Sequence, residues 1–176
     1  MNLDTGKSLS KLQSPIGEII QGFDGQAAWA KTPQGMQTAS AAQSAQAKAA
    51  AARQMIVLLR SYDKPGFEIA AVGEETINGK ALQGVRLTNT ATKDVVTLFI
   101  DNATGEVGAK RYAGQSPLGG PGEMTEISSG YQTIDGVRVP SKTIMMTGSQ
   151  VAAEGTVTGI HLNTGVSDAI FTKPAQ

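Results

Sequence analysis

Short β-prone segments separated by turn residues make up most of the chain. Asn78-Gly79 and Asp135-Gly136 each stand between two such segments. These dipeptides suit type I′ turns, which need a positive φ at both central positions and match the twist of paired strands. Consecutive hairpins of this kind predict an antiparallel meander, because parallel strands would need long crossovers.

Two of the segments indicate where strands lie in the sheet. Val95 to Ile100, "VVTLFI", is apolar on both faces except for one Thr, which predicts a central strand. Glu154 to Leu162, "EGTVTGIHL", alternates Thr with apolar residues and predicts a half-buried strand that would contain His161.

The only Trp stands in Glu18 to Gly35, "EIIQGFDGQAAWAKTPQG". The alternation before Asp24-Gly25 and the Pro-Gln-Gly at the end predict strand, turn, strand, turn, with a two-residue hairpin at Asp24-Gly25. Trp29 would then stand on one face of a sheet, where it either packs on a core or floors a pocket.

Ser40 to Tyr62, which is rich in Ala and free of Gly and Pro, breaks the β pattern. Ser40 is a plausible N-cap, and the composition gives strong intrinsic helicity, so the segment predicts one long helix. Its first half offers small apolar groups, whereas Met55 to Leu59 is bulky on nearly every side. We expect this C-terminal half to be buried against the sheet.

These elements predict a mainly β (α+β) fold. We expect a curled antiparallel half-barrel meander of about ten strands wrapped around the Ala-rich helix, because an antiparallel sheet of that size must curl, close or split. The segment Ala113 to Glu123, "AGQSPLGGPGE", is expected to be a loop, and residues 1–176 are expected to form a single domain.

Composition excludes several classes of function. Lys plus Arg number 15 and Asp plus Glu number 15, so no net field attracts nucleic acid or an anionic membrane. The absence of Cys excludes disulfides and thiolate metal sites. The first residues, "MNLDTGKSLSK", lack the apolar region of a signal peptide, and no apolar window is long enough to span a membrane. As given, the chain is not expected to be exported by itself.

Catalytic motifs are not found either. His161 is the only histidine and has no HExxH spacing, and Ser116 precedes Pro117 rather than standing in a GxSxG elbow. Glu74-Glu75 would point to opposite faces of a strand, and Lys110-Arg111 is interpreted as a solvated strand end. We therefore expect no enzyme, no cofactor and no metal.

Several phrases together resemble the bacterial outer-membrane lipoprotein-sorting family, the LolA/LolB-like proteins. They are "IIQGFDGQAAWAKTPQG", the helix ending "LLRSYDKPGFEI", "GEETINGKALQGVRLT", "VVTLFIDNATGEVGAKRY", "YQTIDGVRVPSKTIMM" and "VTGIHLNTGVSDAIFTKP". The match runs through nearly the whole chain in order, and the FDG-x₃-W before an Ala-rich helix is its most specific part.

The resemblance implies a half-open antiparallel barrel with an apolar concave face plugged by helices. Family members include periplasmic carriers that shield lipoprotein acyl chains, which implies a periplasmic or cell-envelope location. Because members usually have a signal sequence, an N-terminal helix and further strands before the position of Lys7, we expect this chain to lack them. A homodimer or a protein partner would then complete the barrel.

The first functional hypothesis is a lipoprotein-carrier-like domain that binds a lipid or lipoprotein acyl chain. The candidate lining residues are Phe23, Trp29, Met55, Leu58, Leu59, Leu98, Ile100 and Met145. A second hypothesis is an interaction or structural module with a filled core, acting through a sheet edge or the loop 113–122. A third, an enzyme on the same scaffold, would need polar groups to converge, with Arg86, Glu126, Tyr131 and His161 as the residues to test.

Overall fold

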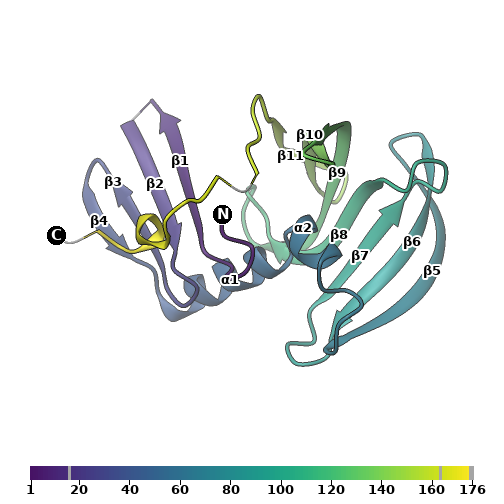
Figure 1. Ribbon diagram of the computed structural model, residues 1–176, viewed down its shortest axis with the longest axis horizontal. Coiled ribbons are helices and arrows are strands. Elements are labelled where there is room, and N and C mark those ends of the chain that lie inside the picture. Colours follow the sequence, from purple (N-terminus) through teal and green to yellow (C-terminus); the bar gives the residue numbers. More distant parts are fainter. Residues whose placement is uncertain (16, 163, 175–176) are drawn as a thin grey trace. The chain divides into compact units, whose positions relative to one another are not determined.

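A computed structural model describes residues 1–15, 17–162 and 164–174 (Figure 1). The chain divides into two compact units. The first unit comprises Met1–Ser61 together with Asn163–Gln176, and the second comprises Tyr62–Leu162.

The first unit contains a sheet of consecutive antiparallel hairpins, here called the first sheet. Its strands, in spatial order, are β1 (Ser8–Ser14), β2 (Gly17–Phe23), β3 (Ala28–Thr32) and β4 (Gly35–Thr38). The strands predicted around Trp29 are thus present. The first turn is longer than expected, because Phe23 pairs with Ala28 and leaves a four-residue loop.

The side chain of Asp24 closes that loop. Its carboxylate accepts the backbone N–H groups of Gln26 and Ala27 at 2.9 and 2.8 Å. The hydrogen bonds from Ala27 and then Gln26 hold the pKa of Asp24 below its usual value. The Asp24 side chain thereby fixes the hairpin.

The predicted helix forms, but as two pieces, α1 (Ala41–Ala52) and α2 (Met55–Leu59). Ser40 is the N-cap of α1, as expected, and it forms a full capping box with Gln43. The expectation of one unbroken helix is wrong. Gln54 has an extended backbone (φ −57°, ψ 131°), and its carbonyl accepts the N–H groups of Val57 and Leu58 to start α2.

No Gly or Pro stands at the break, so local propensity does not cause it. Because of the break, α2, which carries the bulky side chains, does not continue along the axis of the Ala-rich α1. In α2 Leu58 is buried, while Leu59 is 46% exposed, so the expected burial of the C-terminal half holds for part of it. Among its described residues α1 has none that is buried.

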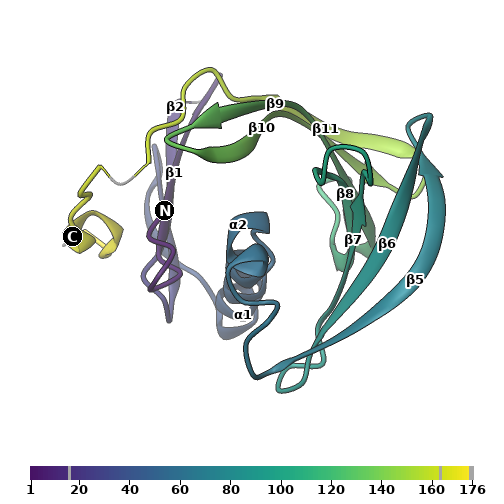
Figure 2. The same ribbon diagram turned by 45° about the vertical axis from the view of Figure 1, so that its right-hand side comes forward.

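The chain returns to the first unit through η1 (Asp168–Phe171), a short 3₁₀ helix. Figure 2 views the first sheet nearly edge-on and shows η1 on one side of it and α1 on the other.

The second unit contains a curved antiparallel meander, here called the second sheet (Figure 2). Its strands follow one another in both sequence and space: β5 (Phe67–Ile77), β6 (Lys80–Asn89), β7 (Val95–Ile100), β8 (Val107–Gln115), β9 (Pro121–Ile134), β10 (Val137–Thr147) and β11 (Gln150–Thr156). The mainly β, antiparallel fold class is therefore confirmed. In the described residues the strands are divided between two sheets.

The turn chemistry also agrees with the sequence. Asn78 and Gly79 have φ values of 49° and 75°, and Asp135 and Gly136 have 48° and 78°, as a type I′ turn requires. β7 lies between β6 and β8, so the prediction of a central strand at Val95 to Ile100 is confirmed.

Two boundaries differ from expectation. The loop between β8 and β9 is restricted to residues 116–120, because Ala113, Gly114 and Gln115 continue the ladder with β9. β11 ends at Thr156, and after one more backbone bond, from Val157 N–H to Ser141 O, the chain leaves the sheet. His161 is thus exposed outside any strand, and glycine at 159 is poorly suited to extending the ladder.

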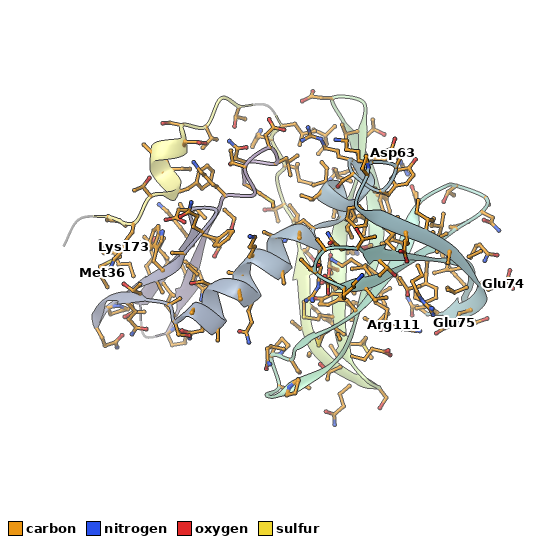
Figure 3. All side chains as sticks on the ribbon, turned by 90° about the horizontal axis from the view of Figure 1, so that it is seen from below. Met36, Asp63, Glu74, Glu75, Arg111 and Lys173 are labelled. Carbon is orange, nitrogen blue, oxygen red and sulfur yellow. The ribbon has the colours of Figure 1, made fainter. Side chains whose placement is uncertain are left out.

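The faces of the second sheet carry different residues. One face holds a cluster of Ile77, Leu82, Phe99 and Ala109, with Ile127 packed against it. Glu74 and Glu75 on β5 point to opposite sides, as predicted, and Figure 3 shows Glu75 beside Arg111 with Glu74 directed away.

Candidate functional site

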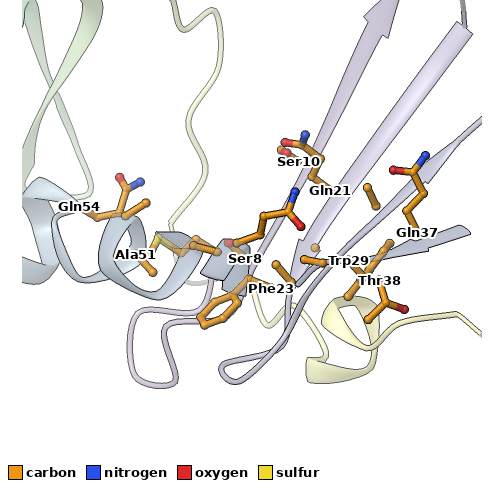
Figure 4. A pocket seen from close by; sticks show the side chains of 17 residues that line it. Ser8, Ser10, Gln21, Phe23, Trp29, Gln37, Thr38, Ala51 and Gln54 are labelled. Atoms are coloured by element: carbon orange, nitrogen blue, oxygen red, sulfur yellow. The ribbon is translucent and has the colours of Figure 1, made fainter. Parts of the chain in front are cut away.

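A groove of about 540 Å³ lies between the first sheet and α1, wholly inside the first unit (Figure 4). This volume is within the range usual for small-molecule sites. Seventeen residues line the groove: Met1, Ser8, Ser10, Gln21, Gly22, Phe23, Ala28, Trp29, Ala30, Gln37, Thr38, Ala39, Gln43, Ala47, Ala50, Ala51 and Gln54.

The sheet side of the groove follows from the strand register. Cross-strand pairing aligns Ser10, Gln21, Ala30 and Gln37 in one row and Ser8, Phe23 and Ala28 in the next. Because side chains alternate across a strand, both rows stand on the same face. We call it the groove face and the opposite one the far face.

The helix side of the groove is one stripe of α1. Gln43, Ala47, Ala50, Ala51 and Gln54 are spaced as neighbours along one side of a helix. Alanine fills the middle of the stripe, and its small side chain leaves the space between helix and sheet open. The groove thus exists because the helix is rich in alanine.

Hydrogen bonds hold the start of α1 to the sheet. The backbone N–H of Ala28 donates to Ser44 Oγ at 3.2 Å, and the N–H of Ala39 donates to Ala28 O at 3.0 Å. Both contacts tie the helix to β3, the strand that carries Trp29. Groove face and helix stripe are therefore positioned by the same short strand.

Trp29 borders the groove, but its indole stands on the far face. Trp29 pairs with Gly22, and a Cβ placed on Gly22 would lie 2.2 Å from Cε2 of the indole. The indole N–H donates to the carbonyl of Phe171 in η1 at 3.1 Å. The sequence left open whether Trp29 packs on a core or forms the floor of a pocket. In the structure its ring is buried and packs with η1.

η1 is fastened to the first unit by polar contacts around Asp168. Lys7 Nζ lies 2.7 Å from the carboxylate of Asp168, and Asn2 Nδ2 donates to the same group at 2.9 Å. The hydrogen bond from Lys7, followed by that from Asn2, lowers the pKa of Asp168. Further along, Lys173 Nζ donates to Thr38 Oγ1 at 2.6 Å.

The other residues predicted to line a lipid site lie elsewhere. Met55, Leu58 and Leu59 belong to α2 and do not line the groove. Leu98, Ile100 and Met145 share one face of the second sheet, where the register aligns Leu98, Lys110, Glu126 and Met145 in a single cross-strand row.

Lys110 and Arg111 are not a solvated strand end. Both lie inside β8, with neighbours on either side, and alternation sends them to opposite faces. Lys110 is 4% exposed, its Nζ lies 3.0 Å from Glu126, and Tyr112 OH donates to the same carboxylate at 2.6 Å. A buried charge needs such a partner, because desolvation without one costs several kcal/mol.

Arg111 has partners of its own on the other face. Its guanidinium donates to both oxygens of Glu75 (Figure 3), at 2.9 and 2.5 Å. It also lies 4.7 Å from the centre of the Phe99 ring. The bidentate bond from Arg111 lowers the pKa of Glu75. These contacts connect β5, the edge strand, to the interior of the sheet.

The residues proposed for an enzyme do not converge. Arg86 and Glu126 stand on opposite faces of the second sheet by register, and His161 is outside the sheet. Tyr131 donates its OH to Val107 O at 2.7 Å, and burial raises its pKa. Within the described ranges, no cluster of three His, Asp or Glu side chains could hold a metal ion.

Sequence reasoning missed the polar half of the groove. Ser8, Ser10, Gln21 and Gln37 carry no motif, and only the strand register brings them together. A weak signal was present in the alternation of Ser8 and Ser10 with Leu9 and Lys11, but residues 18–23 show no such alternation. The stripe of α1 could not be identified from its spacing, because Ala and Gln occur on all sides of this helix.

No family model matches the chain, and no curated protein matches it. Solved structures with a similar fold exist. A DUF1329 family protein from Desulfovibrio piger superposes with a TM-score of 0.56 at 14% identity, covering 98% of this chain and 78% of that one. A LolA superfamily protein from Nitrosomonas europaea gives 0.49 at 15%, covering 95% and 76%.

A domain from Vibrio parahaemolyticus, assigned as an outer membrane lipoprotein-sorting protein, superposes with a TM-score of 0.55 at 12% identity. The match covers 94% of this chain and 74% of that domain. The resemblance noted in the sequence is thereby confirmed for the fold. In the described part of the chain, no helix is both long and apolar enough to cross a membrane.

Proposed function

We propose that the protein is a non-enzymatic, lipoprotein-carrier-like domain of the cell envelope, whose groove between α1 and the first sheet binds an acyl chain of a lipid or lipoprotein. The observation that carries the proposal is the groove itself. It is open, about 540 Å³ in volume, and lined by Ala, Phe and uncharged polar residues.

The lining suits a flexible hydrocarbon. Ala47, Ala50 and Ala51 contribute methyl groups from α1, and Phe23 lines the groove from β2. Each methylene removed from water contributes about 0.8 kcal/mol, so a segment of about six methylenes contributes several kcal/mol without any polar contact. A site of this kind needs no catalytic group.

The fold supports the proposal by analogy. The similar domain from Vibrio parahaemolyticus is assigned to outer membrane lipoprotein sorting. A periplasmic location for this chain is part of the same proposal. Since one fold can host several functions, the groove rather than the fold must supply the test.

The test compares two variants of α1 by native mass spectrometry of protein purified without delipidation. Ala50→Glu places a carboxylate in the groove stripe, whereas Ala45→Glu makes the same change on the exposed opposite side of the helix. We expect wild type and Ala45→Glu to carry lipid. Ala50→Glu should weaken binding of a palmitoyl chain about tenfold, equivalent to losing about two methylene contacts.

Equal lipid occupancy in the two variants would contradict the groove assignment. A wild-type protein that binds no acyl chain, even when one is added, would contradict the function. The predicted lining residues Met55, Ile100 and Met145 provide a second set of positions, and their substitution by Glu is expected to weaken lipid binding less than Ala50→Glu. Leu98 is left out because it is 3% exposed, and a carboxylate there would destabilise the second sheet.

The alternative of a protein-interaction module has one structural observation in its favour. Edge strand β5 exposes Ile69 (51%) and Val72 (39%), and Leu118 (54%) is exposed in the loop 116–120. An unpaired edge with exposed apolar side chains can pair with another strand. Lipid-free protein that forms a defined complex, lost on Ile69→Lys, would favour this alternative.

A further inference from the structure

We infer that the groove selects lipids whose head group is uncharged and carries ester, amide or hydroxyl groups, and that it discriminates against anionic phospholipids. The inference rests on the proposed function and specifies the class of lipid. It follows from where the first sheet places its charged and its hydrogen-bonding side chains.

The first sheet segregates its charges by face. Lys11, Glu18 and Lys31 all fall on the far face, because each is one residue out of step with the groove rows. The stripe of α1 adds Ala and Gln. No Asp, Glu, Lys, Arg or His is among the described residues that line the groove, although 17% of the chain is charged.

The groove instead offers unoccupied hydrogen-bonding groups. Within the described part of the chain, the carboxamides of Gln21, Gln37 and Gln54 make no hydrogen bond to the protein, and neither do the hydroxyls of Ser8 and Ser10. Figure 4 shows these side chains around the groove, from both the sheet and the helix end. Carboxamides and hydroxyls can each donate and accept hydrogen bonds.

Such a lining matches an uncharged polar head better than a charged one. Esters, amides and hydroxyls can exchange their water hydrogen bonds for bonds to Gln and Ser at little net cost. A phosphodiester placed there would lose hydration without meeting a cationic side chain, and an unpaired charge is costly to desolvate. The selectivity would therefore come mainly from rejection of charge.

The experiment presents two lipids with identical chains to the full-length protein. Dipalmitoylglycerol and dipalmitoylphosphatidylglycerol are delivered in the same non-ionic detergent micelles, and the bound fractions are measured by native mass spectrometry over a titration. We expect dipalmitoylglycerol to bind at least about tenfold more tightly.

Two variants that add the same charge to opposite faces isolate the cause. Gln37→Lys puts a cation on the groove face, and Gln13→Lys puts one on the far face, where Gln13 already reaches Glu18. Gln37→Lys is expected to shift the preference toward phosphatidylglycerol by about fivefold. Gln13→Lys is expected to leave it unchanged.

Each outcome has a definite meaning. If wild type binds neither lipid, the proposed function fails. If it binds both lipids equally, or phosphatidylglycerol more tightly, the function stands and the selectivity is overturned. If Gln13→Lys and Gln37→Lys shift the preference equally, long-range charge rather than the groove lining governs it, and the inference is likewise overturned.

Discussion

At the scale of single residues, the absence of a side chain at Gly22 makes room for the indole of Trp29 on the neighbouring strand. The indole lies where a Cβ of residue 22 would be, and its N–H donates a hydrogen bond to the carbonyl of Phe171. Glycine is required here by contact, because no positive φ is recorded for Gly22. The indole therefore packs directly against the backbone of β2 at Gly22, on the far face.

Gly22→Ala is expected to destabilise the protein by about 1–3 kcal/mol, because the new methyl group would overlap the buried indole. The measurement is urea denaturation followed by circular dichroism. Gly155→Ala is the control, since a Cβ there meets nothing within 4 Å. Equal stability of the two variants would show that the indole can move aside.

Glu75 should make stability depend on pH. Its pKa is lowered from 4.5 by the bond from Arg111, so its contribution is present above that value and is lost as the pH falls through the lower, folded-state pKa. Glu75→Gln should lower the urea midpoint at neutral pH, and the gap to wild type should close in acid. Glu74→Gln, on the other face, should show no such gap; a gap that persists in acid would refute the assignment.

Residue-level prediction from sequence succeeded where chemistry is local. The opposite orientation of Glu74 and Glu75 follows from alternation alone. The environment of Lys110 could not be foreseen, because its partner Glu126 comes from another strand and only the register brings them to 3.0 Å.

At the scale of elements, α1 is a helix that packing hardly supports. None of its described residues is buried, so the capping box of Ser40 and Gln43 and the intrinsic helicity of alanine must maintain it. A helix that lines an open groove cannot bury the side that faces the groove. Marginal local stability is therefore a direct result of the geometry of the site.

Ser40→Ala should weaken this helix by about 1 kcal/mol, which corresponds to roughly fivefold faster amide exchange across α1. Hydrogen exchange read by mass spectrometry measures it. Gln46→Ala, on the same helix and exposed, is the control. Unchanged exchange in Ser40→Ala would mean that contacts with β3, rather than the cap, hold α1.

Element prediction worked best where turn chemistry is specific. The Asn-Gly and Asp-Gly turns and the central strand VVTLFI were correctly read, because φ preference and burial are both local signals. The break at Gln54 and the early end of β11 were missed, since neither is marked by a helix breaker or by a loss of alternation.

At the scale of the whole molecule, the first unit is assembled from two distant segments. η1 brings Phe171, which is 1% exposed, onto the far face beside Trp29. The salt bridge between Lys7 and Asp168 joins residues 161 positions apart. The far face of the first sheet is therefore covered at Trp29 only when this later segment has returned.

Phe171→Ala should cost about 3–5 kcal/mol in the first unit, because a large buried ring is removed. The fluorescence of Trp29, the only Trp, should shift to the red as its cover loosens, and exchange in β2 and β3 should rise. Ile170→Ala, which truncates a neighbour that is 45% exposed, should change neither. Unchanged emission from Phe171→Ala would show that η1 does not shield the indole.

The candidate site marks the limit of prediction from sequence at this scale. Phe23, expected to line a lipid site, lies on the groove face. Whether it, Trp29 and the apolar residues chosen on α2 and the second sheet bind lipid stays a prediction. The groove depends on two faces meeting, and only the register and the placement of α1 show which side chains they share.

The return of η1 also sets an order of events during synthesis. Residues 62–162 can pair their strands as soon as they emerge, since each strand pairs with its neighbour in sequence. The first sheet emerges earlier, yet the indole of Trp29 remains exposed to solvent until residues 164–174 have been synthesised. A growing chain would thus expose the far face of the first sheet next to its groove, and a chaperone that binds nascent chains would have an apolar surface to bind there until residues 164–174 have been made.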